Sequence, residues 1–151
     1  MNRDLVKTIE EVSKIRFVKY PVFNIVKDNL EMRNKLDRFQ SDLGLFFKKA
    51  ASETEPVAKD ITFEQAKNVI NPYILPDYSI EENLSVFAMT VLMSNEIIKS
   101  TSGNSNALIL GTQAKNAAEV LIQQKAPNIK GANEDSVLEM IENMNNAEHS
   151  K

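Results

Sequence analysis

The chain has 151 residues, of which 42% are hydrophobic and 26% charged, with a net charge of −3. This is the ordinary composition of one globular domain. The absence of cysteine excludes disulfides, thiol nucleophiles and cysteine-based metal sites. No apolar run approaches the length of a membrane span, and no signal-peptide apolar block follows the first residues. We therefore expect a soluble, cytoplasmic protein without a membrane partner.

The first third of the chain is mildly basic. Residues 1–50 carry 11 Lys or Arg against 7 Asp or Glu, whereas residues 51–100 carry 3 against 8. The favoured interpretation is that these parts attract one another or are solvated. The alternative is a nucleic-acid surface. Its candidate residues are Arg3, Lys7, Lys14, Arg16 and Lys19.

The first predicted helix spans residues 4–18, with Leu5, Ile9 and Val12 as a short apolar stripe. Residues 15–20 are β-branched and aromatic, so the pattern leaves helix and extended strand both open. A helix should end or kink before Pro21.

A long helix is predicted from Pro21 to Ala50, which would measure about 45 Å. The alternatives are a break near Gly44 or a role in oligomerisation. Its charged face carries both signs, which favours solvation over phosphate binding. Its apolar face contains Ile25, Met32, Leu36, Phe39, Leu43, Phe46, Phe47 and Ala50.

Next come a short helix to Ile70, opened by a capping box at Thr62 and Gln65, and an antiparallel helical hairpin over residues 79–124. Ser79 and Glu82 form the capping box of the first hairpin helix. That helix carries two apolar faces, so it is either central or meets a partner chain. One face holds Ile80, Leu84, Phe87, Val91 and Ile98, and the other holds Val86, Met89, Met93 and Ile97.

The second hairpin helix carries a line of small residues that predicts close helix packing. We expect Gly103 to close the preceding helix, and Asn104 or Ser105 to cap this one. Ile109 and Val120 lie nearly opposite the small residues and suggest a second, smaller contact. The small residues are Ala107, Gly111, Ala114 and Ala118.

The last predicted helix is capped by Asn133, with Glu134 and Asp135 in its first turn. It is either the last core helix or a docking element for a partner groove. Residues 145–151 are expected to form a flexible tail. The helix has a narrow apolar edge of Val137, Met140, Ile141 and Met144.

A catalytic site is not predicted. The only histidine is His149, in the expected tail, so metal, haem and nucleophile–histidine designs lack their usual residues. The pairs Glu81/Glu82 and Glu134/Asp135 are explained by helix starts. There is no glycine-rich phosphate loop. We therefore expect no enzyme activity, no cofactor, no metal and no small-molecule substrate.

Together these patterns predict an all-α bundle of about five helices around a central hairpin, 79–124. The domain would span 1–144, with sub-units 1–50 and 62–124. The function expected is a non-enzymatic, homo-oligomeric assembly or adaptor protein. Its composition, rich in Asn, Lys, Ile and Ser, is typical of low-GC bacteria and their phages. The predicted partner contacts are Val86, Met89, Met93, Ile97, Ile109 and Val120. The alternative is a nucleic-acid-binding packaging or regulatory protein using the basic first third.

Overall fold

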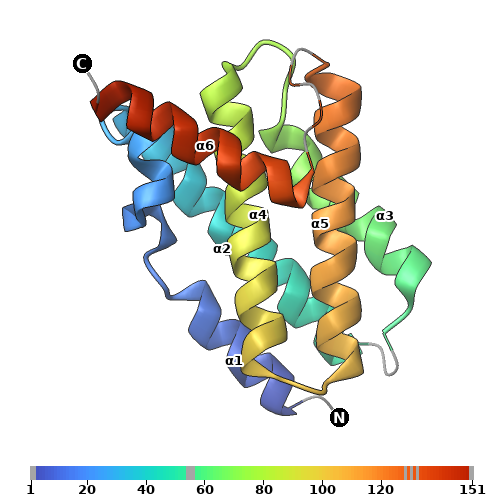
Figure 1. The fold of residues 1–151 in the computed structure, drawn as a ribbon. Helices are drawn as coiled ribbons and strands as arrows, with labels where there is room; N and C mark the ends of the chain where they lie inside the picture. The colour runs from blue at the N-terminus through green and yellow to red at the C-terminus, as the bar shows by residue number, and fades with distance from the viewer. Residues whose placement is uncertain (1–2, 54–56, 128, 130, 132, 150–151) are drawn as a thin grey trace.

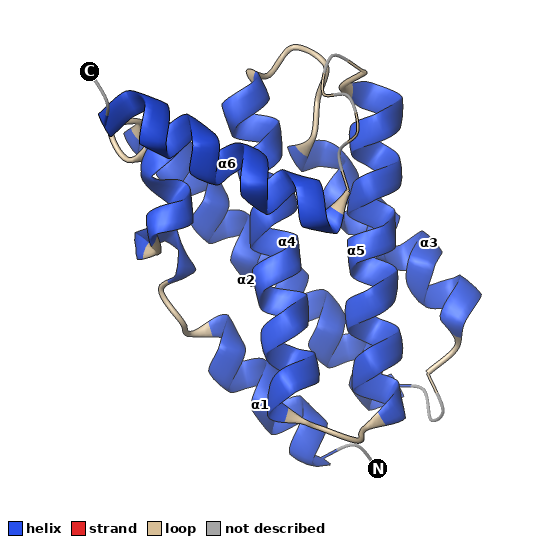
Figure 2. Cartoon of the chain, viewed as in Figure 1, coloured by secondary structure: helices blue, strands red, loops and turns tan. Residues whose placement is uncertain are grey.

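The computed structural model describes residues 3–53, 57–127, 129, 131 and 133–149. These residues form helices and loops without any strand, which confirms the all-α prediction (Figure 2). The predicted number of about five helices is wrong, because the described ranges hold six α-helices and three short 3₁₀ helices. They are α1 (Arg3–Ser13), η1 (Phe17–Lys19), η2 (Pro21–Val26), α2 (Leu30–Glu53), α3 (Lys59–Ile70), η3 (Asn71–Tyr73), α4 (Ile80–Ser100), α5 (Ser105–Lys125) and α6 (Glu134–His149).

Helix α4 lies at the centre of the fold (Figure 1). It contacts α1, α2, α5, α6 and η2, and every residue from Asn83 to Val91 is buried. Both of its apolar faces are therefore covered within one chain. Two apolar faces allow either a central helix or a helix that meets a partner chain, and α4 is a central helix.

Helices α4 and α5 lie side by side, joined by a short turn (Figure 1). The predicted caps are confirmed: Ser79 accepts from the Glu82 N–H at 3.2 Å, and Asn104 accepts from the Asn106 and Ala107 N–H groups. Gly103 has a φ of +85°, the left-handed conformation that glycine adopts without strain. Gly111 lies so close to α4 that a Cβ there would sit 2.6 Å from Ile98 Cδ1. The predicted close packing is thus present.

The basic first third folds differently from the prediction. Helix α1 ends at Ser13, where Gln40 donates to the carbonyls of Ser13 and Ile15, at 3.2 and 2.6 Å. Residues 15–20 are neither α-helix nor strand but contain the 3₁₀ turn η1.

Helix α2 begins only at Leu30, after an Asn29 side chain that accepts from the Met32 N–H at 2.9 Å. Its 24 residues measure about 36 Å. The helix also continues through Gly44, where a Cβ would lie 2.3 Å from Ser13 Oγ. Close approach of α1, and not a helix break, explains that glycine.

Helix α3 begins at Lys59, three residues before the predicted capping box. Thr62 lies inside the helix, where its hydroxyl donates to the Ala58 carbonyl at 2.6 Å, so the capping-box prediction is wrong. Residues 54–56, before this helix, lie outside the described ranges.

Helix α6 crosses α4 and η2 (Figure 1). The predicted cap is present, since Asn133 accepts from the Ser136 N–H at 2.9 Å. The helix continues to His149, so the tail expected from residue 145 is helical as far as the structure describes it. Asn145 is buried and donates to the Pro21 carbonyl at 2.9 Å, a partner 124 residues away that no local pattern reveals.

Candidate functional site

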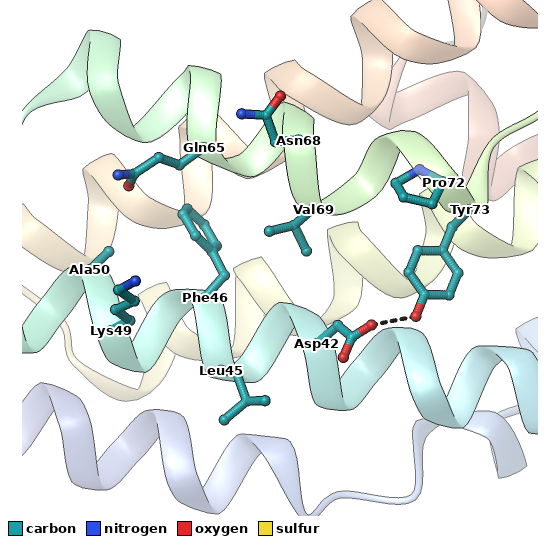
Figure 3. A pocket seen from close by; sticks show the side chains of 10 residues that line it. All are labelled: Asp42, Leu45, Phe46, Lys49, Ala50, Gln65, Asn68, Val69, Pro72 and Tyr73. Carbon is teal, nitrogen blue, oxygen red and sulfur yellow. Dashed lines mark hydrogen bonds between the residues drawn. The ribbon is translucent and has the colours of Figure 1, made fainter.

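A groove lies between α2 and α3 (Figure 3). Its volume is about 640 Å³, within the range typical of binding pockets. Most of its lining is apolar, and polar side chains stand at its ends and along the α3 wall. The lining residues are Asp42, Leu45, Phe46, Lys49, Ala50, Gln65, Asn68, Val69, Pro72 and Tyr73.

Leu45 is the exposed apolar side chain at the outer edge of the α2 wall. Leu43 and Phe47 face the core with no exposed surface, whereas Leu45 projects outward with 65% of its surface exposed. On the α1 side of this edge lies a second hollow of about 450 Å³, which Leu45 also lines. Leu45 therefore stands as an apolar knob between two concave surfaces. In Figure 3 it points away from α3, and Phe46 points toward it.

The α3 wall carries both amide and apolar side chains. Gln65, Asn68 and Pro72 recur at spacings of three and four residues, which places them on one helical face. Ile61 lies one turn before Gln65 on the same face and is 58% exposed. Val69 supplies an apolar side chain between Phe46 and Pro72 (Figure 3).

One end of the groove is closed by Tyr73. Its hydroxyl donates to the Asp42 carboxylate, and its ring packs against Phe39 with centroids 4.8 Å apart (Figure 3). Burial, followed by the hydrogen bond to Asp42, raises the pKa of Tyr73 to about 12. The phenol therefore stays protonated and acts as a fixed donor.

Lys35 fixes the segment that carries Tyr73. Its ammonium donates to the Tyr73 carbonyl at 3.0 Å and lies 3.5 Å from the centroid of the Tyr78 ring. Burial lowers the pKa of Lys35 to about 8, and the nearby Glu82 carboxylate opposes that shift. Asn83 of α4 bonds both the N–H and the carbonyl of Leu75, at 3.2 and 2.9 Å. This end of the groove is thus held from α2 and from α4.

Lys49 stands at the other end of the α2 wall, seven residues after Asp42, which is about 10 Å along the helix. Its neighbour Lys48 is paired with Glu10 at 2.9 Å. No hydrogen bond or ion pair of the Lys49 side chain occurs within the described ranges. The groove is therefore negative at one end and positive at the other.

The residues predicted to contact a partner do not form a surface. Val86, Met89, Met93 and Ile97 have no exposed area, and they pack in the core of the single chain. Ile109 and Val120, on α5, are half-buried. The apolar pattern identified buried positions and did not distinguish burial in the chain from burial against a second chain.

The five predicted nucleic-acid contacts are all exposed. Arg3 and Lys7 lie one turn apart on α1, and Lys14 follows Ser13, the last residue of that helix. Glu10 lies on the face of α1 that Arg3 and Lys7 share, and its carboxylate is paired with Lys48, which lowers the pKa of Glu10. An acidic side chain thus interrupts the basic stripe.

Within the described ranges, no three acidic or histidine side chains gather as they would around a metal ion. The side chain of His149 lies outside what the structure describes. None of the described helices combines the length and the apolar character needed to cross a membrane. Comparisons with protein-family models, with curated proteins and with solved structures found no match.

Sequence reasoning missed the groove and the exposed Leu45 on its α2 wall. One signal was present: Leu45 is an apolar residue on the charged face of α2, between Asp42 and Lys49. The hollow itself has no local signature, because it depends on the spacing of α3 and α2.

Proposed function

We propose that the protein is a non-enzymatic adaptor or assembly protein that binds protein helices through the α2–α3 groove. The observation that supports this proposal is the exposed Leu45 beside an open, mostly apolar hollow. An exposed leucine alone is ordinary, but a knob next to an apolar groove with a polar rim is typical of an interaction site.

An amphipathic helix is the occupant that this shape favours. The groove runs between two helices, as in helix-in-groove recognition, where apolar anchors recur every three or four residues. Its central lining is apolar (Phe46, Val69 and Pro72), and its polar groups lie at the rim. Apolar anchors would supply affinity, and the amides Gln65 and Asn68 would fix orientation.

A selection from a displayed library of helical peptides tests this function. We expect enriched peptides to carry apolar residues at positions i, i+3 or i+4, and i+7, and to lose binding to the Leu45→Glu and Val69→Glu variants. Leu30→Glu is the matched control, because Leu30 is also exposed (69%) and lies outside the groove. Peptides that bind Leu45→Glu and Val69→Glu as tightly as the original protein would refute the groove as the site.

Nucleic-acid binding is a second proposal, favoured by five exposed basic side chains in the first third of the chain. They are Arg3, Lys7, Lys14, Arg16 and Lys19. The interruption by Glu10 makes it the weaker one. At low salt, the affinity for DNA or RNA should decrease when Lys14, Arg16 and Lys19 are changed to Ala. The affinity of the original chain should also decrease as the salt concentration rises. No binding of either polymer at low salt would eliminate it.

A further inference from the structure

We infer that the α2–α3 groove takes the N-terminal end of a partner's amphipathic helix, with the first turn of that helix against Asp42. The partner helix then runs in the same direction as α2 and passes Lys49 further along. This inference rests on the proposed function, because it names the part of the partner that the same groove binds and the direction in which that part lies.

A side-chain bridge crosses the groove at one end. The Tyr73 hydroxyl, from η3 on the α3 side, donates to the Asp42 carboxylate on α2 (Figure 3). The segment that carries Tyr73 is itself held by Lys35, whose ammonium bonds the Tyr73 carbonyl at 3.0 Å. A helix that lies along the groove must end or turn away at this bridge. One of its two termini therefore meets Asp42.

The chemistry of the bridge favours an N-terminus. The first four N–H groups of a helix have no partner within it, and they carry the positive end of the helix dipole. Asp42 is exposed and accepts one hydrogen bond, from Tyr73, so its carboxylate retains acceptor capacity. A helix C-terminus would set unpaired carbonyls against this carboxylate, and the Tyr73 hydroxyl that could serve them is already donated to Asp42.

The other charges on α2 agree with this direction. Lys49 lines the groove about 10 Å beyond Asp42 along α2. It therefore faces a later part of the partner helix, where free carbonyls or a carboxylate side chain would pair with a cation. Arg38 lies one turn before Asp42 and does not line the groove. The reverse direction would set like charges together at both ends, which is repulsive.

The apolar part of the groove lies between the two charges. Phe46 on α2 and Val69 on α3 project into this middle part (Figure 3). Asp42 and Lys49 are about two turns apart, so the second turn of the partner helix lies over Phe46 and Val69. Peptides selected on the groove should therefore carry an apolar anchor in the second turn and a carboxylate in the third.

Disulfide trapping measures the direction of the bound helix. The chain has no cysteine, so Pro72→Cys places a single thiol beside Tyr73, and Gln65→Cys places one toward the Lys49 end (Figure 3). The selected peptides are synthesised with one cysteine in the first turn or in the third. The first-turn cysteine should react mainly with Pro72→Cys, and the third-turn cysteine with Gln65→Cys. Leu30→Cys is the control, because Leu30 is exposed outside the groove.

Asp42→Asn tests the contact with the first turn. Asparagine removes the charge, but its amide oxygen can still accept from Tyr73, so the bridge is retained. The affinity for a peptide with a free N-terminus should fall about two- to fivefold, the effect of one charge at a helix terminus. The loss should be smaller for an N-acetylated peptide, which lacks the terminal positive charge. Asp37→Asn is the matched control, because Asp37 is an exposed carboxylate of α2 outside the groove.

The outcomes distinguish this inference from the proposed function. If the first-turn cysteine reacts with Gln65→Cys, or with both variants equally, the direction is overturned. The proposed function then still stands if Val69→Glu abolishes binding of the same peptides. Equal affinities of Asp42→Asn and Asp37→Asn would overturn the contact between the first turn and Asp42. If no selected peptide requires Val69, the groove is not the site and both proposals fail.

Discussion

Lys35 illustrates how a single residue can link the groove to the stability of the fold. Its ammonium is buried between the Tyr73 carbonyl and the Tyr78 ring, with 8% of the residue exposed. Glu82 favours its charged form, whereas burial and Arg38 disfavour it. The net effect is a pKa of about 8 in the folded chain, below the ordinary value of 10.5.

This difference predicts a pH dependence of stability. Between pH 8 and about 10 the unfolded chain holds the Lys35 proton and the folded chain releases it, so the free energy of unfolding should rise with pH. The increase is at most about 1.4 kcal/mol per pH unit for one proton. Urea unfolding at several pH values should show a steeper rise in the original chain than in Lys35→Met, where the lowered pKa of Lys125 still contributes.

The control is Lys27→Met, since Lys27 is exposed and its loss should leave the slope intact. Measurements should stay below pH 10, because the raised pKa of Tyr73, about 12, makes stability fall above that pH. An equal slope in Lys35→Met and the original chain would show that another group causes it.

Gly111 gives a second test at the residue scale. In an exposed helix, Gly→Ala would add about 1 kcal/mol of helix stability. Here a Cβ would lie 2.6 Å from Ile98 Cδ1 and 3.1 Å from the Ser94 carbonyl oxygen, so Gly111→Ala should cost about 1–3 kcal/mol by overpacking. Chemical denaturation measures it.

The same substitution should also be made in an Ile98→Ala variant, which lacks the Ile98 atoms that lie nearest to the added Cβ. The cost of Gly111→Ala should shrink in that background, as a double-mutant cycle would show. A neutral or stabilising Gly111→Ala in the original chain would mean that α4 and α5 separate easily.

At the scale of elements, α6 is attached by polar contacts at both ends. Lys115 of α5 pairs with Glu134 at 3.1 Å and bonds Asn95 of α4 at 2.8 Å. Glu134→Gln should weaken this anchor by about 1 kcal/mol, the usual scale for a hydrogen bond that loses its charge. Amide exchange in α6 should then accelerate roughly fivefold, with α4 and α5 little changed.

Glu139→Gln is the control for that measurement, since Glu139 is an exposed carboxylate on the same helix. Mass-spectrometric hydrogen exchange resolves the three helices. Equal acceleration in α4, α5 and α6 would contradict independent opening of the last helix.

The elements also show which parts of the fold are readable from sequence. Ser79, Asn104 and Asn133 were predicted as caps because each bonds an N–H only two or three residues away. The start of α3 was predicted at Thr62, three residues too late. The Val57 N–H just before it bonds Asn106, a partner 49 residues away on α5. Contacts over such separations have no local pattern.

The same limit explains why the candidate groove was missed. The periodicity of α4 correctly indicates a helix covered on two sides, but it is silent on what covers it. The exposure of Leu45 depends on where α1 and α3 lie against α2, which is decided by the packing of the whole chain. Lys35 belongs to the charged face of the predicted long helix, which was expected to be solvated, but it is buried against Tyr73 and Tyr78.

At the scale of the whole molecule, substitutions in the core should affect stability, and substitutions on the contact surface should affect binding. Met93 has no exposed area, so Met93→Ala should lower the free energy of unfolding by about 2–5 kcal/mol. Leu45→Ala should change it by at most about 0.5 kcal/mol, yet weaken the binding of peptides selected on the groove. Denaturation and peptide titration measure the two quantities.

The reverse result would mean that the contact surface lies on α4. Loss of peptide binding in Met93→Ala with stability unchanged would mean that α4 contacts the partner, as the sequence alone allowed.

The bond from Asn145 to the Pro21 carbonyl has a consequence for synthesis on the ribosome. Its two residues are 124 positions apart, so the α6 side of α4 and η2 stays uncovered until nearly all the intervening chain has emerged. Uncovered apolar surface on a nascent chain is where premature association begins. The apolar surface of α4 and η2 is therefore protected from association only when α6, the last helix to be synthesised, packs on it.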